Sequence, residues 1–446
     1  MRILLGLTEV SGYFARLKQG FDELGVEAVH ISLQSHRFSY SGEAKMPRIV
    51  VWARYCVGKR LAAAQSSALW RAFWLTAVIV TRLLLLAWAL ARFDVFILGA
   101  GSSFFSFREL PLLRLLGKKV IYTLHGTDAR PPYIDGFFDP SQYDLPVNTI
   151  HDLTLETPRE RAERFALAHT AIARRRRQQV QAIERNATAV LCGPSYSHFL
   201  TKPFVNFYAV GIPTSASQWN QISSKTPLEQ GRVRILHAPS ELRGKGTHEI
   251  RNAIATLQIR ALPIDYIEIS GRPNVEVMAE ITRCDLVIDQ LYSDTPMAGF
   301  AAEAGLLGIP AVVGGYYSAS VRDHVPADQM PPTAFCHPDK LVSVVTALVV
   351  DPVARAQLGA AAQRHVTEQW GPKVVAERFL RILDEVPPDW LIDPRQVTYL
   401  HGCGLSEEQA RANVAAMISR GGVASLQLQH RPDLEYMFET FAKGAR

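Results

Sequence analysis

The chain has 446 residues, more than one ordinary hydrophobic core supports, so two domains and an appendage are expected. Its 48% apolar and 20% charged residues are typical of a soluble globular protein and exclude a disordered chain. Five scattered cysteines without a CxxC pair argue against a disulfide framework or a zinc site, and they favour a reducing cytosol. The first apolar run, residues 3–7, is too short for a signal peptide and reads as a first strand.

The charge is unevenly distributed along the chain. Residues 1–212 contain 26 Lys and Arg against 16 Asp and Glu, whereas residues 213–446 contain 22 against 26. Four successive arginines, 174–177, lie in a predicted helix and cover all of its faces. The basic half predicts contact with an anionic partner, either a membrane surface or a phosphorylated acceptor; an ordinary solvated surface is the alternative. No aromatic platform accompanies the arginines, so a nucleic-acid partner is not expected.

Short apolar runs alternate with helical patterns, first over residues 1–212 and again over residues 213–392. The predicted strands of the first half lie near 2–7, 26–33, 93–99, 118–126 and 187–194, and those of the second near 232–240, 264–270, 284–290 and 309–315. Strand–helix alternation of this kind predicts two Rossmann-like, doubly wound α/β domains that face a cleft. Residues 393–446 follow as a small extension of unknown role, with Ser406 as a predicted helix cap.

Residues 68–93 form the most hydrophobic stretch of the chain and are long enough to span a bilayer. Arg82 lies in the middle of the stretch, where a charge is unfavourable in a membrane, and the stretch occupies the helix position before a predicted strand. The stretch therefore reads as a buried domain helix or as a membrane-surface helix, for which its Trp and Arg residues are suited. A spanning helix would split the first domain.

The segment "ILHAPSELRGKGTHEI", residues 235–250, begins as a strand and ends as a helix. A helix N-terminus offers free N–H groups to an anion, glycines allow close backbone approach, and basic side chains add charge. The residues predicted to hold a diphosphate here are Arg243, Lys245, Gly246 and Thr247. An ordinary solvated strand–helix loop is the alternative.

A second strand–helix junction follows within residues 292–315. The N–H groups of Ala298, Gly299 and Phe300 are predicted to face the same anion. Glu303 lies one turn further along the helix, where its carboxylate could accept hydrogen bonds from a ribose diol. Stabilisation of its own helix dipole is the alternative role for Glu303.

These two motifs, "HAPS…RGKGT" and "GFAAEAGLLGIPAVV", resemble those of the GT-B glycosyltransferases, in particular the large retaining group known as family 4. The resemblance implies that Arg243 and Lys245 grip the diphosphate of a nucleotide diphosphosugar and that Glu303 binds its ribose. It also implies that Ser11 and Gly12 face the cleft from the loop after the first strand.

The strand end "YTLHGTDARPPY" resembles the family's segment near the reacting sugar, which makes His125 and Asp128 the catalytic candidates, with Arg130 within reach. The sequence departs from the family at Thr295, beside Asp294, where many members have a glutamate near the donor sugar. The identity of the sugar and the role of this loop therefore stay open.

The sequence predicts a glycosyltransferase that moves a sugar from a nucleotide diphosphosugar to a glycan or glycolipid acceptor in polysaccharide biosynthesis. The resemblance implies retention of anomeric configuration, and no metal or cofactor beyond the donor is expected because no ligand cluster is visible. The expected location is the cytoplasm, at the inner membrane surface. The alternatives are a catalytically silent GT-B scaffold in a polysaccharide assembly and a nucleotide-sugar epimerase.

Overall fold

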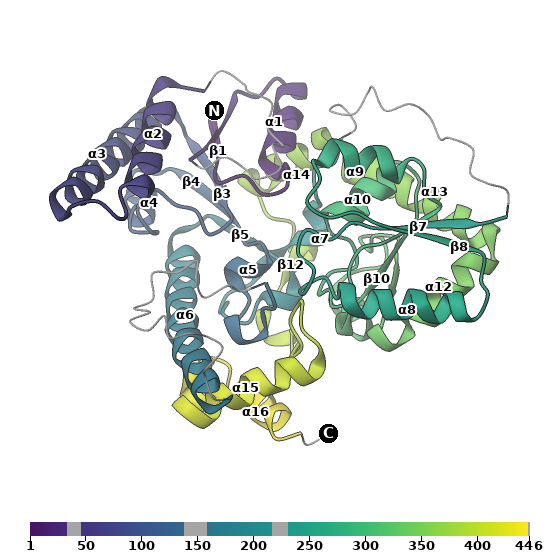
Figure 1. The fold of residues 1–446 in the computed structure, drawn as a ribbon. Coiled ribbons are helices and arrows are strands. Elements are labelled where there is room, and N and C mark those ends of the chain that lie inside the picture. The colour runs from purple at the N-terminus through teal and green to yellow at the C-terminus, as the bar shows by residue number, and fades with distance from the viewer. Residues whose placement is uncertain (34–45, 138–157, 216–230, 445–446) are drawn as a thin grey trace.

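The computed structural model describes residues 1–33, 46–137, 158–215 and 231–444, and Figure 1 shows two α/β domains side by side. Within these ranges the first sheet has the strand order β12-β6-β5-β4-β3-β1-β2, parallel throughout except for β12. Its strands are β1 (Ile3–Leu7), β2 (Ala28–Ser32), β3 (Val95–Gly99), β4 (Lys119–Thr123), β5 (Ala189–Cys192), β6 (Phe204–Asn206) and β12 (Leu391–Ile392). The second sheet has the order β11-β10-β9-β7-β8 and is parallel. Its strands are β7 (Val233–His237), β8 (Ile264–Glu268), β9 (Leu286–Ile288), β10 (Ala311–Gly314) and β11 (Ala334–Cys336).

Helices cover both faces of each sheet, because parallel strands buried on both sides need an apolar layer above and below. The first domain contains α1 (Tyr13–Glu23), α2 (Arg48–Ala62), α3 (Ala68–Arg92), α4 (Leu110–Leu115), α5 (Gly126–Ala129), α6 (Pro158–Asn186) and α7 (Phe207–Val210). The second half contains α8 (Thr247–Ile259), α9 (Asn274–Ile281), α10 (Gly299–Leu306), α11 (Val321–His324), α12 (Leu341–Val350), α13 (Pro352–Gln369) and α14 (Pro372–Asp384). The prediction of two doubly wound α/β domains is confirmed.

The chain returns to the first domain after α13. Helix α14 packs on α1 so closely that a Cβ on Gly20 would lie 2.0 Å from the carbonyl oxygen of Pro372. Strand β12 then pairs antiparallel with β6 of the first sheet. The end of the range 213–392 thus belongs by packing to the first sheet, and the boundary at 392 stays a prediction.

The extension after residue 393 lies against the first domain (Figure 1). Its helices α15 (Glu407–Gly421) and α16 (Pro432–Ala442) share an apolar cluster with α6 and the first sheet. Ser406 caps α15 as predicted, in a reciprocal arrangement with Gln409. The turn before α15 touches both domains: the carbonyl of Cys403 accepts from Gly136 N–H at 2.8 Å, and Gly404 N–H donates to the Tyr292 carbonyl at 2.7 Å. The extension therefore braces the junction between the domains.

Helix α3 occupies the helix position before β3 but buries only one stripe, formed by Val78, Thr81, Leu85, Leu86 and Ala89. Together with α2 it forms a hairpin that projects from the first domain (Figure 1). The exposed large apolar residues of this hairpin are Val51, Trp52, Tyr55, Leu61, Leu69, Trp70, Phe73, Leu75, Ile79, Val80, Leu83 and Leu84. The expectation of a buried domain helix is therefore wrong for most of the surface of α3.

Candidate functional site

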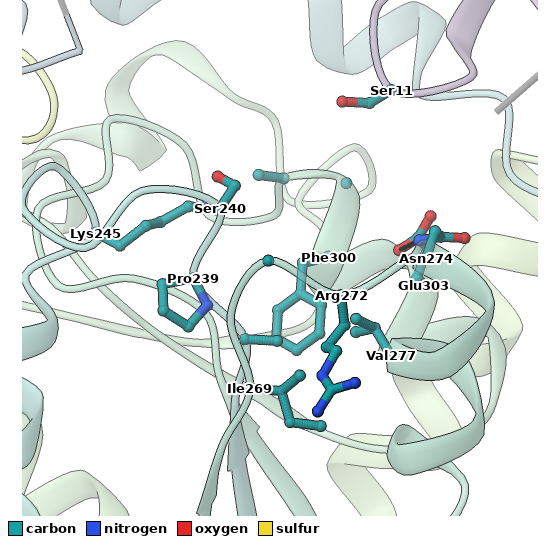
Figure 2. A pocket seen from close by; sticks show the side chains of 14 residues that line it. Ser11, Pro239, Ser240, Lys245, Ile269, Arg272, Asn274, Val277, Phe300 and Glu303 are labelled. Atoms are coloured by element: carbon teal, nitrogen blue, oxygen red, sulfur yellow. Dashed lines mark hydrogen bonds between the residues drawn. The ribbon is translucent and has the colours of Figure 1, made fainter. Parts of the chain in front are cut away.

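A cavity of about 310 Å³ lies between the two domains, at the carboxyl ends of their strands, where α/β proteins place their ligands. Figure 2 shows Ser11 reaching the cavity from the first domain, opposite residues of the second. The lining residues are Ser11, Ala238, Pro239, Ser240, Lys245, Ile269, Gly271, Arg272, Asn274, Val277, Ala298, Gly299, Phe300 and Glu303. Six of the predicted site residues are thereby brought together from three distant segments: Ser11, Lys245, Ala298, Gly299, Phe300 and Glu303.

The loop before α1 is fixed by the carboxylate of Glu9, a residue that was not predicted from the sequence. Both Ser11 and Gly12 have positive φ, 49° and 79°, which turns the chain sharply into α1. Glu9 accepts hydrogen bonds from the N–H groups of Val10, Phe14 and Ala15 at 2.8, 3.2 and 3.0 Å. Burial raises the pKa of Glu9, and these N–H groups oppose that rise. Gly12 therefore acts as the pivot of the turn, while Ser11 faces the cavity.

Only one member of the predicted basic pair lines the cavity. Lys245 does so, and its Nζ lies 2.9 Å from Oδ1 of the buried Asp289. Arg243 is exposed and lies outside the lining. The carboxylate of Glu241 accepts from the N–H groups of Arg243 and Gly244, so those two groups already have an anionic partner. Arg243 was predicted from its charge, its place in the strand–helix loop and the motif resemblance, and none of these reveals which way a side chain points.

Gly246 and Thr247 support the loop from beneath the cavity. Gly246 is the residue before α8 and has φ 67°, and a Cβ there would lie 2.8 Å from Cβ of Leu291. Thr247 is buried, and its hydroxyl is 3.0 Å from Nε2 of His237. The hydroxyl predicted to meet the donor is therefore bonded inside the domain.

The N-terminus of α10 forms the opposite wall, with Ala298, Gly299 and Phe300 on the lining. Glu303 is 5% exposed. Its Oε1 is 3.0 Å from Nη2 of Arg16, on α1 of the first domain, and its Oε2 accepts from Asn274 at 3.2 Å. Burial raises the pKa of Glu303, and the Arg16 guanidinium opposes this. The predicted ribose ligand is thus also a contact between the domains.

The loop from β8 to α9 supplies lining residues that sequence reasoning missed: Ile269, Gly271, Arg272 and Asn274. They follow a predicted strand in the order Ser-Gly-Arg-Pro-Asn, a turn composition at the carboxyl end of a parallel strand. That position was the signal that could have identified them.

His125 and Asp128 lie in the first domain, outside the lining of this cavity. The imidazole of His125 packs edge-on against Tyr13 and Phe207, and burial lowers its pKa to about 4. Its Nε2 has no hydrogen-bond partner within the described part of the chain. Asp128 accepts from the N–H of His125 at 3.0 Å, and burial raises its pKa to about 7. The pair could serve as neutral proton donor and acceptor near pH 7, but its catalytic role stays a prediction.

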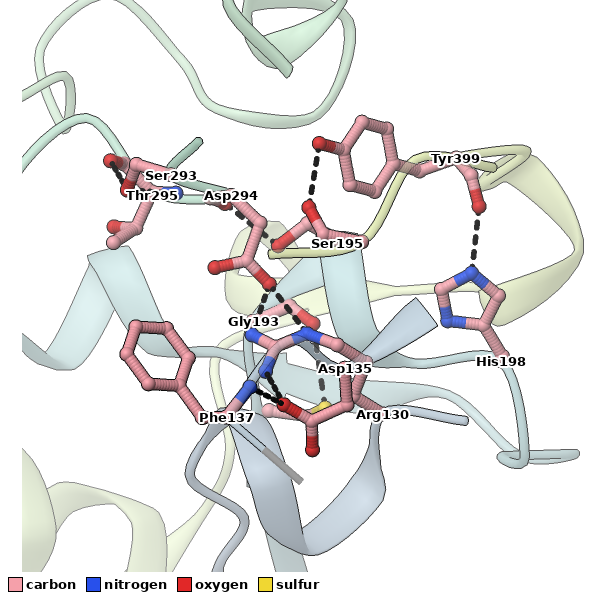
Figure 3. A network of polar contacts seen from close by, with 12 residues as sticks. Arg130, Asp135, Phe137, Gly193, Ser195, His198, Ser293, Asp294, Thr295 and Tyr399 are labelled. Carbon is pink, nitrogen blue, oxygen red and sulfur yellow. Dashed lines mark hydrogen bonds and ion pairs between the residues drawn. The ribbon is translucent and has the colours of Figure 1, made fainter. Parts of the chain in front are cut away.

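Arg130, Asp294 and Thr295 form a second contact between the domains (Figure 3). Nε of Arg130 donates to Oδ2 of Asp294 at 3.0 Å, and its Nη1 is 3.3 Å from Asp135. Thr295 accepts from the hydroxyl of Tyr208 at 2.8 Å. These side chains are bonded within the protein, to one another or to Asp135 and Tyr208, and none of the three lines the cavity.

Among the described residues, no group of three or more His, Cys, Asp or Glu is placed to hold a metal ion. Asp289, the carboxylate beside Lys245 of the cavity, forms an ion pair with this lysine.

No protein-family model matches the chain, and no curated protein matches its sequence. Solved structures show distant similarity. HepE of Anabaena, in complex with UDP, has 12% identity and a TM-score of 0.44, over 86% of this chain and all of that one. The spinosyn rhamnosyltransferase SpnG, complexed with spinosyn aglycone, has 12% identity and a TM-score of 0.41, over the same shares. MnaA of S. aureus, with UDP, has 9% identity and a TM-score of 0.40, over 86% of this chain and 98% of that one.

Proposed function

We propose that the protein is a glycosyltransferase that takes its sugar from a nucleotide diphosphosugar. The observation that carries this proposal is the cavity between the domains, where Lys245 meets α10, which contributes both its N-terminus and Glu303. A lysine and free helix N–H groups suit a diphosphate, and a fixed carboxylate suits a ribose diol. The names of the similar HepE and MnaA structures, which include UDP, agree with this ligand class.

The donor would occupy the cavity in three parts. Its diphosphate would meet Lys245, Ser240 and the N–H groups at the start of α10. Its ribose would bind Glu303, whose Oε2 is oriented by Asn274. Its base would lie along the apolar side formed by Ile269 and Val277, with Arg272 at the edge.

In the proposed reaction, an acceptor hydroxyl oxygen bonds to the anomeric carbon as the bond from that carbon to the diphosphate breaks. The hydroxyl proton leaves with the diphosphate or passes to a neighbouring base. Charge developing on the diphosphate would be stabilised by Lys245 and the α10 N–H groups. We propose that this stabilisation needs no metal and that the configuration is retained, as in the family that the motifs resemble.

A catalytically silent scaffold is the second candidate, and one observation favours it. Asp294 and Thr295, at the place of the family's sugar-side glutamate, are committed to contacts with Arg130 and Tyr208. Such a protein would bind the donor without turning it over. An epimerase would need carboxylates around the sugar, and in the described part of the cavity lining Glu303 is the one carboxylate.

The test is a panel of UDP-, GDP-, dTDP- and CMP-sugars in a thermal-shift assay of the wild type and Glu303→Gln, with the exposed Glu368→Gln as matched control. We expect one donor class to stabilise the wild type and the control, and to stabilise Glu303→Gln much less. Slow hydrolysis of that donor without acceptor supports a transferase, and binding without hydrolysis supports a scaffold. If no nucleotide sugar raises the melting temperature of the wild type, the proposed function is wrong.

We also propose that the α2–α3 hairpin seats the protein on the cytoplasmic face of a membrane, where it meets a glycolipid or lipid-linked glycan. Residues 46–93 contain seven Lys and Arg and no Asp or Glu. Exposed Trp70 and Phe73 stack on each other beside this charge. Apolar anchors with basic residues are the composition of an interfacial helix that prefers anionic lipid.

Sedimentation with vesicles tests whether the α2–α3 hairpin binds a membrane surface. We expect the wild type to bind vesicles of phosphatidylcholine and phosphatidylglycerol in equal parts, and to bind phosphatidylcholine alone weakly. Trp70→Glu combined with Phe73→Glu should abolish binding, while Ile259→Glu, at an exposed apolar residue of α8, should leave it unchanged. Equal binding by both variants would contradict a role for the hairpin.

A further inference from the structure

A second cavity, of about 300 Å³, lies wholly within the first domain. It opens at the carboxyl ends of β1 and β3, where Leu7 and Thr8 meet the loop of residues 100–107. Helix α3 contributes Arg82, and helix α6 contributes Arg175. Leu7 and Thr8 precede Ser11, which lines the donor cavity, so one loop serves both cavities.

The lining is basic and rich in hydroxyl groups. Two arginines line it, Arg82 and Arg175, and the described lining contains no Asp or Glu. Four hydroxyl residues complete it: Thr8, Ser102, Ser103 and Ser106. The nearby Glu109 turns its carboxylate to the N–H groups of Phe104 and Phe105, at 2.9 and 3.0 Å. The positive charge in the cavity is therefore not neutralised by a lining carboxylate.

Arg82 is the unexpected member of this lining. It lies in the middle of an apolar helix, where burial and the charge of Arg60 lower its pKa and the Glu109 carboxylate opposes this. The Nη1 of Arg82 donates to the carbonyl of Phe104 at 3.3 Å, but its buried Nε has no partner among the described residues. A partly buried guanidinium whose nearby carboxylate, Glu109, is already bonded to backbone N–H groups is unfavourable, and a bound anion would lower that penalty.

The backbone around the cavity is also strained. Ala100, Ser106 and Phe107 have φ of 56°, 49° and 70°, a region that residues with a Cβ seldom adopt. All three line this cavity. Strain of this kind persists where the surroundings fix it, and it gathers at ligand sites.

We propose that this cavity binds the phosphate group of a phosphate-ester acceptor, gripped between Arg82 and Arg175. The assignment of the ester as acceptor rests on the proposed glycosyl transfer; the anion site itself rests on the contacts above. Val57 of α2 also lines the cavity, so the rest of the acceptor has a route along the α2–α3 hairpin. The phosphate could be that of a lipid headgroup or of a soluble phosphate ester.

Two probes distinguish these sources: glycerol 3-phosphate in solution, and dodecyl phosphate in micelles of a non-ionic detergent. Affinity is measured by calorimetry without any nucleotide sugar. The variants are Arg82→Gln, Arg82→Lys and Arg175→Gln, with Arg174→Gln as the matched control, because Arg174 is an exposed neighbour on α6 outside the lining. Arg175 is itself exposed, so its variant should fold even if Arg82→Gln does not.

We expect at least one probe to bind the wild type, and Arg82→Gln and Arg175→Gln each to weaken it at least about tenfold. Arg82→Lys should recover part of the affinity, and Arg174→Gln should change it less than about twofold. Binding of dodecyl phosphate alone indicates a lipid source, and binding of both probes indicates that the phosphate suffices. The proposal is overturned if neither probe binds, or if Arg174→Gln weakens binding as much as Arg175→Gln.

This result is independent of the donor. Phosphate binding without donor stabilisation would leave the anion site intact and remove the proposed function. Stabilisation by a nucleotide sugar without phosphate binding would overturn the anion site and leave the proposed function intact.

Discussion

Two buried arginine–carboxylate pairs join the domains, and they differ in what surrounds them. The inner pair, Arg130 with Asp294, is 3% exposed on each side and belongs to a closed network with Asp135. The cavity pair, Arg16 with Glu303, is 4% and 5% exposed, but its carboxylate lines the donor cavity. In both pairs the arginine comes from the first domain and the acid from the second.

The surroundings decide what each pair can do. Asp135 also meets Nη1 of Arg176 at 3.2 Å, and Ser195 donates to the carbonyl of Asp294 at 2.8 Å, so the inner pair is fixed from several sides. Glu303 has a cavity on one side that a ligand or water can enter. The inner pair therefore acts as a permanent joint, whereas the cavity pair has room to exchange part of its contact for the proposed donor. Similar ion pairs in one interface thus serve different roles.

The largest expected effect comes from breaking the inner pair. Asp294→Ala leaves the Arg130 guanidinium buried with Asp135 as its remaining carboxylate, and we expect the free energy of unfolding to fall by about 3–5 kcal/mol. Urea denaturation measures this, with the exposed Asp323→Ala as control. The double variant Arg130→Met with Asp294→Leu should recover a good part of the loss. A loss below about 1 kcal/mol would contradict the role of this pair as a joint.

Breaking the cavity pair should have a smaller effect on stability. In Arg16→Met the Glu303 carboxylate keeps Asn274 and can take water or a proton from the cavity side, so we expect a loss of about 1–3 kcal/mol. The control is Lys18→Met on the same helix, a partly exposed lysine paired with Asp22. Donor affinity should also change in Arg16→Met and stay unchanged in Lys18→Met. Equal losses from the inner and cavity pairs would remove the distinction between them.

The variant Thr247→Val tests whether the Thr247 hydroxyl only stabilises the loop or also contacts the donor. The variant leaves Nε2 of His237 without its hydroxyl partner, so we expect a loss of about 1–2 kcal/mol in stability. Donor affinity should change less than about twofold, since the hydroxyl does not line the cavity. Thr256→Val, whose hydroxyl bonds only the backbone of the same helix, is the control. A loss of donor affinity without a loss of stability would indicate that Thr247 contacts the donor.

The remaining prediction concerns pH and the first domain. Burial raises the pKa of Asp128 from 3.8 to about 7, so the folded chain holds this proton over a range in which the unfolded chain releases it. Its contribution to stability is therefore greatest at low pH and is lost as the pH rises from about 4 to about 7. The difference of about three pKa units corresponds to about 4 kcal/mol, so relative to Asp128→Asn the wild type should lose up to about that much between those pH values. A difference in stability between the wild type and Asp128→Asn that does not change with pH would contradict this.

Much of the fold could be predicted from the sequence because its signals are local. Apolar runs located the strands from β1 to β5 and from β7 to β10 but not β6, and Ser406 was predicted as the cap of α15. The cavity residues on α10 followed from the position of a helix after a buried strand. The strands that followed from alternation and the helix cap at Ser406 were correct, whereas the roles predicted for His125 and Asp128 at a strand end stay predictions.

The contacts between distant segments could not be predicted. Arg16 and Glu303 are 287 residues apart, and Arg130 and Asp294 are 164 apart, so nothing local marks them as partners. The exposure of Arg243 likewise depends on Glu241 holding the loop N–H groups. The return of β12 to the first sheet is a pairing of two short strands with no sequence signal of its own.

The central claim is that the cavity between the domains holds a nucleotide diphosphosugar on Lys245 and Glu303. The direct test is calorimetric titration of the donor that stabilises the wild type best, into Lys245→Met, Glu303→Gln and Arg243→Met. The account predicts that the first two variants lose at least about tenfold in affinity, whereas Arg243→Met, at an exposed residue outside the lining, loses less than about twofold. Unchanged affinity in Glu303→Gln, or an equal loss in Arg243→Met and Lys245→Met, would contradict it.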